Sequence, residues 1–248
     1  MKTGTLQTRA SHANHDLALR KRKAQKIIAV LATRRDLAGA KLLEVGTGAG
    51  IIAAELAAVV GPRGHVESVD VTDERVVTDG YRFTRIAGTA LPFSAAHFDI
   101  VVSNHVIEHV GDHRAQAHHL SEIRRVLDTA GLVYLAAPNK WRWMEPHFRL
   151  PLLSWLPLDV ADRYVRATGK GSRYDRLPPS RATLIRLTRE AGLVSEDITW
   201  EVLQRMAQNS ELGGVSAFIR HFGYPAYRLG RVVIPTNILV ARCARSCR

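Results

Sequence analysis

The chain has 248 residues, of which 46% are hydrophobic and 23% are charged, and its formal net charge is +12. This length and apolar content favour one large α/β domain with a buried core, and they exclude a disordered or low-complexity chain. Both cysteines, Cys243 and Cys247, lie in the last six residues, so a disulfide scaffold is excluded and we expect a cytoplasmic protein. Residues 1–35 lack the apolar segment of a secretory signal, and no run reaches the ~18 apolar residues that a membrane span needs.

The N-terminal region divides into a polar arm and a helix. Residues 1–15 are polar and show no apolar period, which predicts a flexible arm. A helical pattern begins at Asp16, which is a candidate N-cap. The apolar side of this helix comprises Leu17, Ala24, Ile27, Ile28 and Leu31.

Strands and helices then alternate through a predicted core over residues 41–139. The expected strands are 41–45, 65–71, 82–87, 98–103 and 131–137, and the expected helices are 49–60 and 112–127. This alternation predicts a doubly wound, mostly parallel sheet with helices on both faces.

A different kind of sequence follows Pro138. Residues 139–180 contain three of the four Trp and five of the ten Pro without a clean period, which predicts an inserted aromatic cap. Segment 141–157 could line an apolar substrate pocket, lie at a membrane interface, or fold onto its own core. Residues 181–241 then predict a C-terminal helix (181–191) and two strands (193–200 and 232–241). The domain thus spans 16–241, with a basic tail over 242–248.

The strongest local signal is a glycine-rich turn at residues 44–50, between a predicted strand and helix. Its spacing is E-x-G-x-G-x-G. Glycines at such a turn allow a tight bend and a close approach of a ligand to the backbone. The dinucleotide-binding pattern G-x-G-x-x-G would need glycine at position 51, where this chain has Ile51.

Together with four later motifs, this turn resembles class I S-adenosylmethionine-dependent methyltransferases, in the type 11 subgroup that includes quinone-biosynthesis enzymes. The matching segments, which together cover roughly residues 40–140, are Glu44–Gly50, Val69-Asp70, Leu91–Phe93 with Phe98–Ser103, Val106–Val110, and Glu122–Leu127 with Ala130–Leu132. The resemblance implies a Rossmann-like sheet of seven strands and methyl transfer from S-adenosylmethionine.

The resemblance also implies which residues bind the cofactor. Gly46 and Gly48 would pass beneath its methionine and ribose, and Asp70 would accept hydrogen bonds from both ribose hydroxyls. Relatives often carry an adenine-binding Asp where this chain has Ala87, so adenine would rest on the backbone beside it. The complete expected set is Glu44, Gly46, Thr47, Gly48, Gly50, Asp70, Val71, Gly88, Thr89, Ala90 and Asn104.

Candidate catalytic residues follow the fourth predicted strand, at the sheet edge where such folds bind ligands. His105 is the first candidate for a base or an acceptor contact, and Glu108 and His109 are further candidates. His105, His109 and His113 recur every four residues, but no cysteine or distant third ligand accompanies them. We therefore expect no metal.

The positive charge is concentrated outside the predicted core. Residues 1–40 carry +7, residues 41–139 carry −4 and residues 140–248 carry +9. The basic flanks favour an anionic acceptor. We expect methyl transfer to a small, amphipathic or anionic organic acceptor, with lipid-like molecules included and peripheral membrane contact through 141–157. The alternatives are RNA methylation and a catalytically decayed cofactor-binding or membrane-associated protein. The chain has no recognisable RNA-binding module, which counts against the first alternative.

Overall fold

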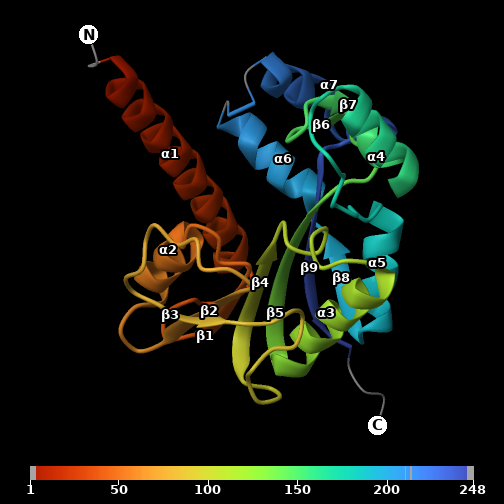
Figure 1. Cartoon of the computed structure of the whole chain (residues 1–248). Helices are drawn as coiled ribbons and strands as arrows, with labels where there is room; N and C mark the ends of the chain where they lie inside the picture. Colours follow the sequence, from red (N-terminus) through yellow and green to blue (C-terminus); the bar gives the residue numbers. More distant parts are fainter. Residues whose placement is uncertain (1–3, 210, 213, 245–248) are drawn as a thin grey trace.

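The computed structural model describes residues 4–209, 211–212 and 214–244. Its centre is a seven-stranded sheet in the order β3-β2-β1-β4-β5-β9-β8, with helices on both faces (Figure 1). The strands are β1 (Lys41–Val45), β2 (His65–Asp70), β3 (Arg82–Arg85), β4 (Phe98–Asn104), β5 (Leu127–Pro138), β8 (Leu193–Asp197) and β9 (Thr236–Cys243). β1 to β5 pair in parallel, and β9 runs antiparallel to both β5 and β8. The predicted fold class is confirmed.

Each face of the sheet packs its own hydrophobic core, because successive side chains of a strand point to opposite faces. On β1, Leu42 packs with α1 (Gly4–Ala32), α2 (Ile51–Val60) and α6 (Thr199–Gln208). Its neighbour Leu43 packs on the other face with α3 (His113–Val126) and α5 (Arg181–Glu190). Burial on both faces explains why β1 and β4 are almost continuously apolar.

Helix α1 begins at Gly4, so residues 4–15 are helical where the sequence predicted an arm and an N-cap at Asp16. The sequence has neither Gly nor Pro between Gly4 and Gly39, so nothing ends the helix on the N-terminal side of Asp16. Polar residues can extend a helix without an apolar stripe. Of the predicted apolar side, Ala24, Ile27 and Leu31 are buried, as expected for the end that packs on the sheet.

Several predicted boundaries shift for local reasons. α2 begins at Ile51 because Gly50 has a left-handed φ of 80°, which a right-handed helix cannot include. β5 begins at Leu127, directly after α3, and not at Gly131. The strand predicted to run to Trp200 ends at Asp197, since Thr199 starts α6.

The C-terminal part contains two helices that the sequence analysis missed. These are α6 and α7 (Gly214–Gly230), which pack on each other and occupy the chain between β8 and β9. α7 is kinked at Gly223, whose φ is 58°. β9 begins at Thr236 and reaches Cys243. The rest of the predicted basic tail, residues 245–248, lies outside the described residues.

The inserted cap is a small unit of its own beyond β5. It comprises the two-stranded sheet β6 (Met144–Glu145) and β7 (Leu150–Pro151), the short helix η1 (Leu153–Trp155) and α4 (Leu158–Ala167). Its buried core is formed by Leu150, Leu153, Ala161, Val165 and Tyr174. Trp143 is 61% exposed, whereas Arg142 and Glu145 are buried. Membrane contact through 141–157 stays a prediction.

Within the described residues, none of the helices is both long enough and apolar enough to traverse a bilayer.

Candidate functional site

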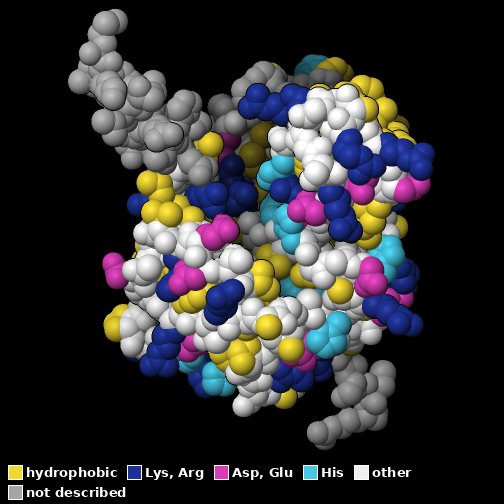
Figure 2. Space-filling model, viewed as in Figure 1, with side chains coloured by type: hydrophobic (Ala, Val, Ile, Leu, Met, Phe, Trp, Pro, Cys, Tyr) yellow, Lys and Arg dark blue, Asp and Glu magenta, His cyan; other side chains and the backbone are white. Residues whose placement is uncertain are grey.

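A cleft of about 1390 Å³ opens at the carboxyl ends of β1 and β4, between α1, the cap and the α6–α7 pair. Figure 2 shows it as a hollow with basic side chains on both walls and apolar side chains at its floor. Parallel strands present their carboxyl ends at one edge, which is where open α/β sheets bind ligands. Seven of the predicted site residues line this cleft: Gly46, Thr47, Gly48, Asn104, His105, Glu108 and His109.

The glycine turn between β1 and α2 has a left-handed φ at Gly46, Gly48 and Gly50. A Cβ on Gly46 would lie 2.3 Å from Val106 Cγ2, and one on Gly50 would lie 2.1 Å from Val77 O, so both positions exclude larger residues. A Cβ on Gly48 would meet nothing closer than a side-chain nitrogen at 3.9 Å. The backbone at Gly48 is therefore open to a ligand, which fits the cofactor implied by the sequence.

Asp70 ends β2 and lies half-buried beside this turn. Its Oδ2 accepts a hydrogen bond from the N–H of Gly48 at 2.9 Å, and its Oδ1 accepts one from the N–H of Val71 at 2.7 Å. The N–H of Thr72 adds a longer hydrogen bond to Oδ1, at 3.5 Å. A carboxylate has about four acceptor positions, so these three backbone donors leave capacity for a hydroxyl donor of a ligand. Asp70 itself does not line the cleft.

Glu44 lies beneath the turn and is 1% exposed. Its Oε2 accepts a hydrogen bond from Ser68 Oγ at 3.2 Å, and Ser68 also hydrogen-bonds to Thr47. Burial raises the pKa of Glu44 from 4.5 to about 8, and the nearby charge of Asp70 adds to this increase. Through Ser68, the Glu44 side chain therefore helps to hold Thr47 and the turn in place.

The residues expected near adenine lie after β3 and do not line the cleft. Gly88 and Ala90 are exposed. The Thr89 hydroxyl hydrogen-bonds to Nδ1 of His118 at 2.6 Å. Ala87, at the position where relatives often have an acid, is also exposed. This position therefore offers no carboxylate to adenine.

A buried carboxylate lies between two histidines at the end of β4. Glu108 is 3% exposed; its Oε1 lies 3.4 Å from His105 Nδ1 and 3.9 Å from His109 Nε2. The other oxygen, Oε2, is buried without a hydrogen-bond partner among the described residues. His105 adopts a left-handed φ of 59°, and its N–H donates to Ala136 O at 2.8 Å. Such strain is typical of functional positions.

The third histidine of the predicted series turns away from this cluster. His113 Nδ1 lies 3.3 Å from Gln116 Oε1, in the first turn of α3. In the described parts of the chain, no group of three or more His, Cys, Asp or Glu side chains is arranged to hold a metal ion.

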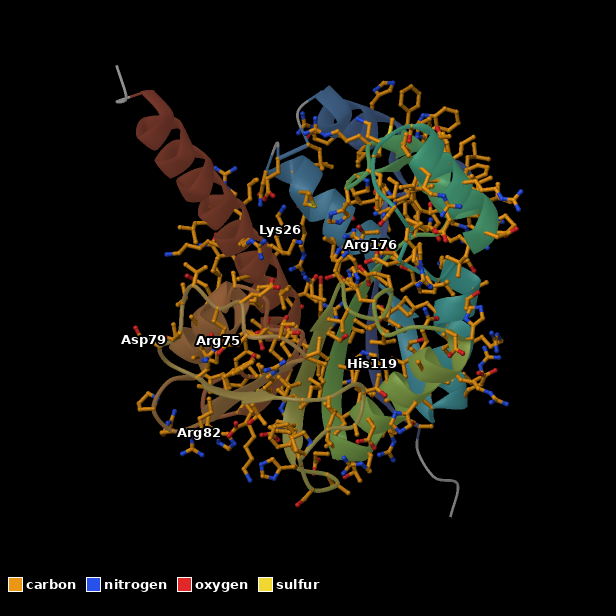
Figure 3. All side chains as sticks on the ribbon, in the orientation of Figure 1. Lys26, Arg75, Asp79, Arg82, His119 and Arg176 are labelled. Carbon is orange, nitrogen blue, oxygen red and sulfur yellow. The ribbon has the colours of Figure 1, made fainter. Side chains whose placement is uncertain are left out.

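Other parts of the cleft come from the basic flanks, including segment 141–157, which the sequence offered as a possible pocket lining, and from the C-terminal helices that the sequence did not predict. α1 contributes Arg20, Arg22, Lys23 and Lys26, the cap region contributes Arg142, His147 and Arg176, and the C-terminal helices contribute Trp200, Leu203, Met206 and Tyr227. Figure 3 places Lys26 and Arg176 on opposite walls. The basic flanks and the aromatic cap were the available signals, but only the fold shows that they face one another.

Comparison with known proteins agrees with this geometry. A family model described as a methyltransferase domain matches residues 43–135. The ubiquinone biosynthesis O-methyltransferase of Thiobacillus denitrificans is 28% identical over 182 residues, which cover 67% of this chain and 70% of that protein.

Two solved structures share the fold. PKMT2 from Rickettsia typhi is 13% identical with a TM-score of 0.56, and the match covers 86% of this chain and 50% of that one. Phosphoethanolamine N-methyltransferase 2 from Haemonchus contortus is 15% identical with a TM-score of 0.53, covering 89% and 52%. Sheet order, glycine turn and methyltransferase domain thus agree, and together they support a class I S-adenosylmethionine-dependent methyltransferase.

Proposed function

We propose that this methyltransferase acts on an oxygen of a small organic acceptor that binds in the cleft between the cap and α1. The observation that carries the proposal is one cavity of about 1390 Å³ that holds both the glycine turn and the His105–Glu108–His109 cluster. Ligand pockets usually measure about 300–1,000 Å³, so this cleft has room for a cofactor and an acceptor together. The name of the Thiobacillus relative, an O-methyltransferase, supports oxygen as the methylated atom.

The residues present fit the cofactor. Gly48 offers open backbone and Asp70 offers spare carboxylate acceptors beside it, so Gly46, Gly48 and Asp70 would hold the methionine and ribose parts. S-adenosylmethionine supplies an electrophilic methyl group. We assign Glu44 and Thr47 to the support of the turn, and Gly50, Val71, Gly88, Thr89, Ala90 and Asn104 to the surrounding cofactor site.

The protein's own contribution to catalysis is alignment and removal of a proton. A hydroxyl acceptor must lose its proton as the oxygen is methylated, and a positioned histidine is suited to accept it. His105 Nδ1 faces the buried carboxylate of Glu108, which leaves Nε2 of His105 to accept the proton. Glu108 would orient the ring and stabilise its charged form, and His109 would contribute from the other side of the same carboxylate.

The wall of the cleft that α6 and α7 form is suited to contact the apolar part of an organic acceptor. Trp200, Leu203, Met206 and Tyr227 present apolar surface from α6 and α7, and water-excluding surfaces of this kind favour direct displacement.

RNA methylation would instead depend on the basic side chains of α1, and a decayed enzyme would bind cofactor without turnover.

Two measurements test the proposal. Calorimetric titration with S-adenosylhomocysteine should show binding to the wild type. Tritiated S-adenosylmethionine should then label the small-metabolite fraction of a cell extract, and His105→Gln should reduce this labelling by about 10²-fold or more while leaving S-adenosylhomocysteine affinity unchanged. Labelling confined to RNA, or cofactor binding without labelling of any fraction, would overturn the proposed acceptor class.

A further inference from the structure

Two arginines of the cap region, Arg142 and Arg176, line the cleft and share one carboxylate. Arg142 Nη2 lies 2.7 Å from Glu145 Oε1, and Arg176 Nη1 lies 3.7 Å from the same oxygen. The other oxygen of Glu145 accepts the N–H groups of His147 and Phe148, both at 2.7 Å. One carboxylate therefore neutralises one of two guanidinium groups.

A second carboxylate near Arg176 compensates little. Asp175 Oδ1 lies 3.7 Å from Arg176 Nε, but the side chain of Asp175 is 71% exposed whereas that of Arg176 is 18% exposed. Interactions with such an exposed charge are screened by water and salt. The arginine pair retains about one positive charge on the cleft wall.

The guanidinium groups also keep donors without partners. The Nε atoms of Arg142 and Arg176 are buried and make no hydrogen bond with any residue that the structure describes. Arg142 donates to Glu145 through Nη2, whereas none of the donors of Arg176 reaches a described acceptor within hydrogen-bond distance. A guanidinium has five N–H donors, and leaving them unpaired away from water is unfavourable. Such an arrangement indicates an anionic partner that is not part of the chain.

The pair is held next to the proposed base. The N–H of Leu177, the residue after Arg176, donates to Glu108 O at 2.9 Å, and Gln116 Nε2 donates to Leu177 O at 2.8 Å. Arg176 is thereby fixed beside Glu108. Burial lowers the pKa of His147, the positive charges of Arg176 and Arg142 lower it further, and the carboxylate of Glu145 opposes them, which places these groups in one electrostatic neighbourhood.

We propose that Arg142 and Arg176 bind an anionic oxyacid group, a carboxylate or a phosphate, carried by the methyl acceptor. Paired planar guanidinium groups match the oxygens of both groups through bidentate hydrogen bonds. With its anionic group bound by these arginines, the acceptor would direct its hydroxyl toward His105 while its apolar part contacts α6 and α7. This inference rests on the proposed function and adds to it the charge and the anchoring point of the acceptor.

Aromatic probes with and without an anionic group test the inference. Benzoate, phenyl phosphate and the neutral benzamide are titrated calorimetrically into the full chain saturated with S-adenosylhomocysteine. We expect at least one anionic probe to bind at least 10-fold more tightly than benzamide, and Arg176→Gln to remove this preference. Arg176→Lys, which keeps the charge without the planar fork, should retain part of it.

Two matched variants locate the effect. Arg163→Gln removes an exposed arginine of α4 that does not line the cleft, and it should bind like the wild type. Lys26→Gln removes a cation from the opposite wall, where Lys26 pairs with Glu211 at 2.7 Å, and it should also retain the preference. Thermal melts check that each variant folds.

The outcomes separate the two proposals. Equal binding of all three probes, or a preference lost in Lys26→Gln but kept in Arg176→Gln, would overturn the anion site while S-adenosylhomocysteine binding still supported the proposed function. Failure of the wild type to bind S-adenosylhomocysteine would instead refute the proposed function itself. A preference for phenyl phosphate alone, or for benzoate alone, would identify which oxyacid group the site selects.

Discussion

The buried carboxylate beneath the glycine turn should make the stability of the protein fall as the pH rises. The pKa of Glu44 increases from 4.5 to about 8 in the folded protein, mainly through burial. Between these values folding takes up a proton, so the free energy of unfolding decreases with rising pH. Replacing Glu44 with Gln keeps the shape of the side chain but removes its ionisation, and the decrease should shrink.

The magnitude follows from the pKa values and from a second buried group. Each pKa unit corresponds to about 1.36 kcal/mol, so the full effect of Glu44 is about 5 kcal/mol, with most of it between pH 4.5 and pH 8. His119 acts in the opposite direction below pH 6.5, because burial lowers its pKa to about 4. The cleanest window is therefore pH 6.5 to 8.5, where Glu44 alone should contribute a loss of about 1.5–2 kcal/mol.

Urea unfolding followed by fluorescence, at half-unit steps across this window, measures the effect. From pH 6.5 to 8.5, the difference in free energy of unfolding between Glu44→Gln and the wild type should increase by about 1.5–2 kcal/mol in favour of the variant. The control Glu55→Gln removes a carboxylate from α2, where Glu55 is partly exposed and lies 3.6 Å from Lys21. If wild type and Glu44→Gln show parallel curves, Glu44 is ionised in the folded protein and the reasoning fails.

Three further predictions test the turn, the cofactor site and the core. Gly46→Ala should destabilise the protein by more than about 2 kcal/mol in urea unfolding, since its Cβ would lie 2.3 Å from Val106, whereas Gly48→Ala, at a φ that is also positive (48° against 87°), has no such contact; equal losses would show that the clash is irrelevant. Asp70→Asn should weaken S-adenosylhomocysteine binding about 10- to 100-fold by calorimetry, and unchanged affinity would remove Asp70 from the site. His119→Gln should reduce the loss of stability on acidification from pH 6.5 to 4 by up to about 3 kcal/mol, a prediction refuted by an unaltered acid-unfolding curve.

The core of the fold could be predicted because its signals are local. The apolar runs of β1 and β4 and the glycine turn mark the parallel sheet, since these strands are buried on both faces. The helix α6 was missed although its apolar residues recur at helical spacing, and α7 was missed as well. Trp200 follows the strand β8 after two residues, meets Tyr224 edge-to-face and Tyr227 at a tilt, and also faces the cleft. The strand predicted over 193–200 included the start of α6, so the boundary between strand and helix was misplaced.

The site divides in the same way. The residues on the turn and after β4 could be predicted, because they lie beside the strands that define the sheet edge. Arg142 and Arg176 could not, because their importance depends on the shared carboxylate of Glu145. A sequence shows that a cap has several arginines, but it does not show which of them share one buried carboxylate.

The distribution of charge around the cleft explains how an anionic acceptor could be recruited as well as held. Six Lys and Arg side chains line it, four from α1 and two from the cap region, against three Glu. Cations on opposite walls of a recess with low-dielectric sides focus the field into it and raise the association rate of anions. The α1 cations lie on the wall opposite Arg176, which suits them to attraction over a distance, whereas the buried Arg142 and the partly buried Arg176 suit direct contact. Raising the salt concentration should therefore slow association of an anionic acceptor more than it speeds dissociation, because exposed charges are screened within about 10 Å at 0.1 M and buried ones much less.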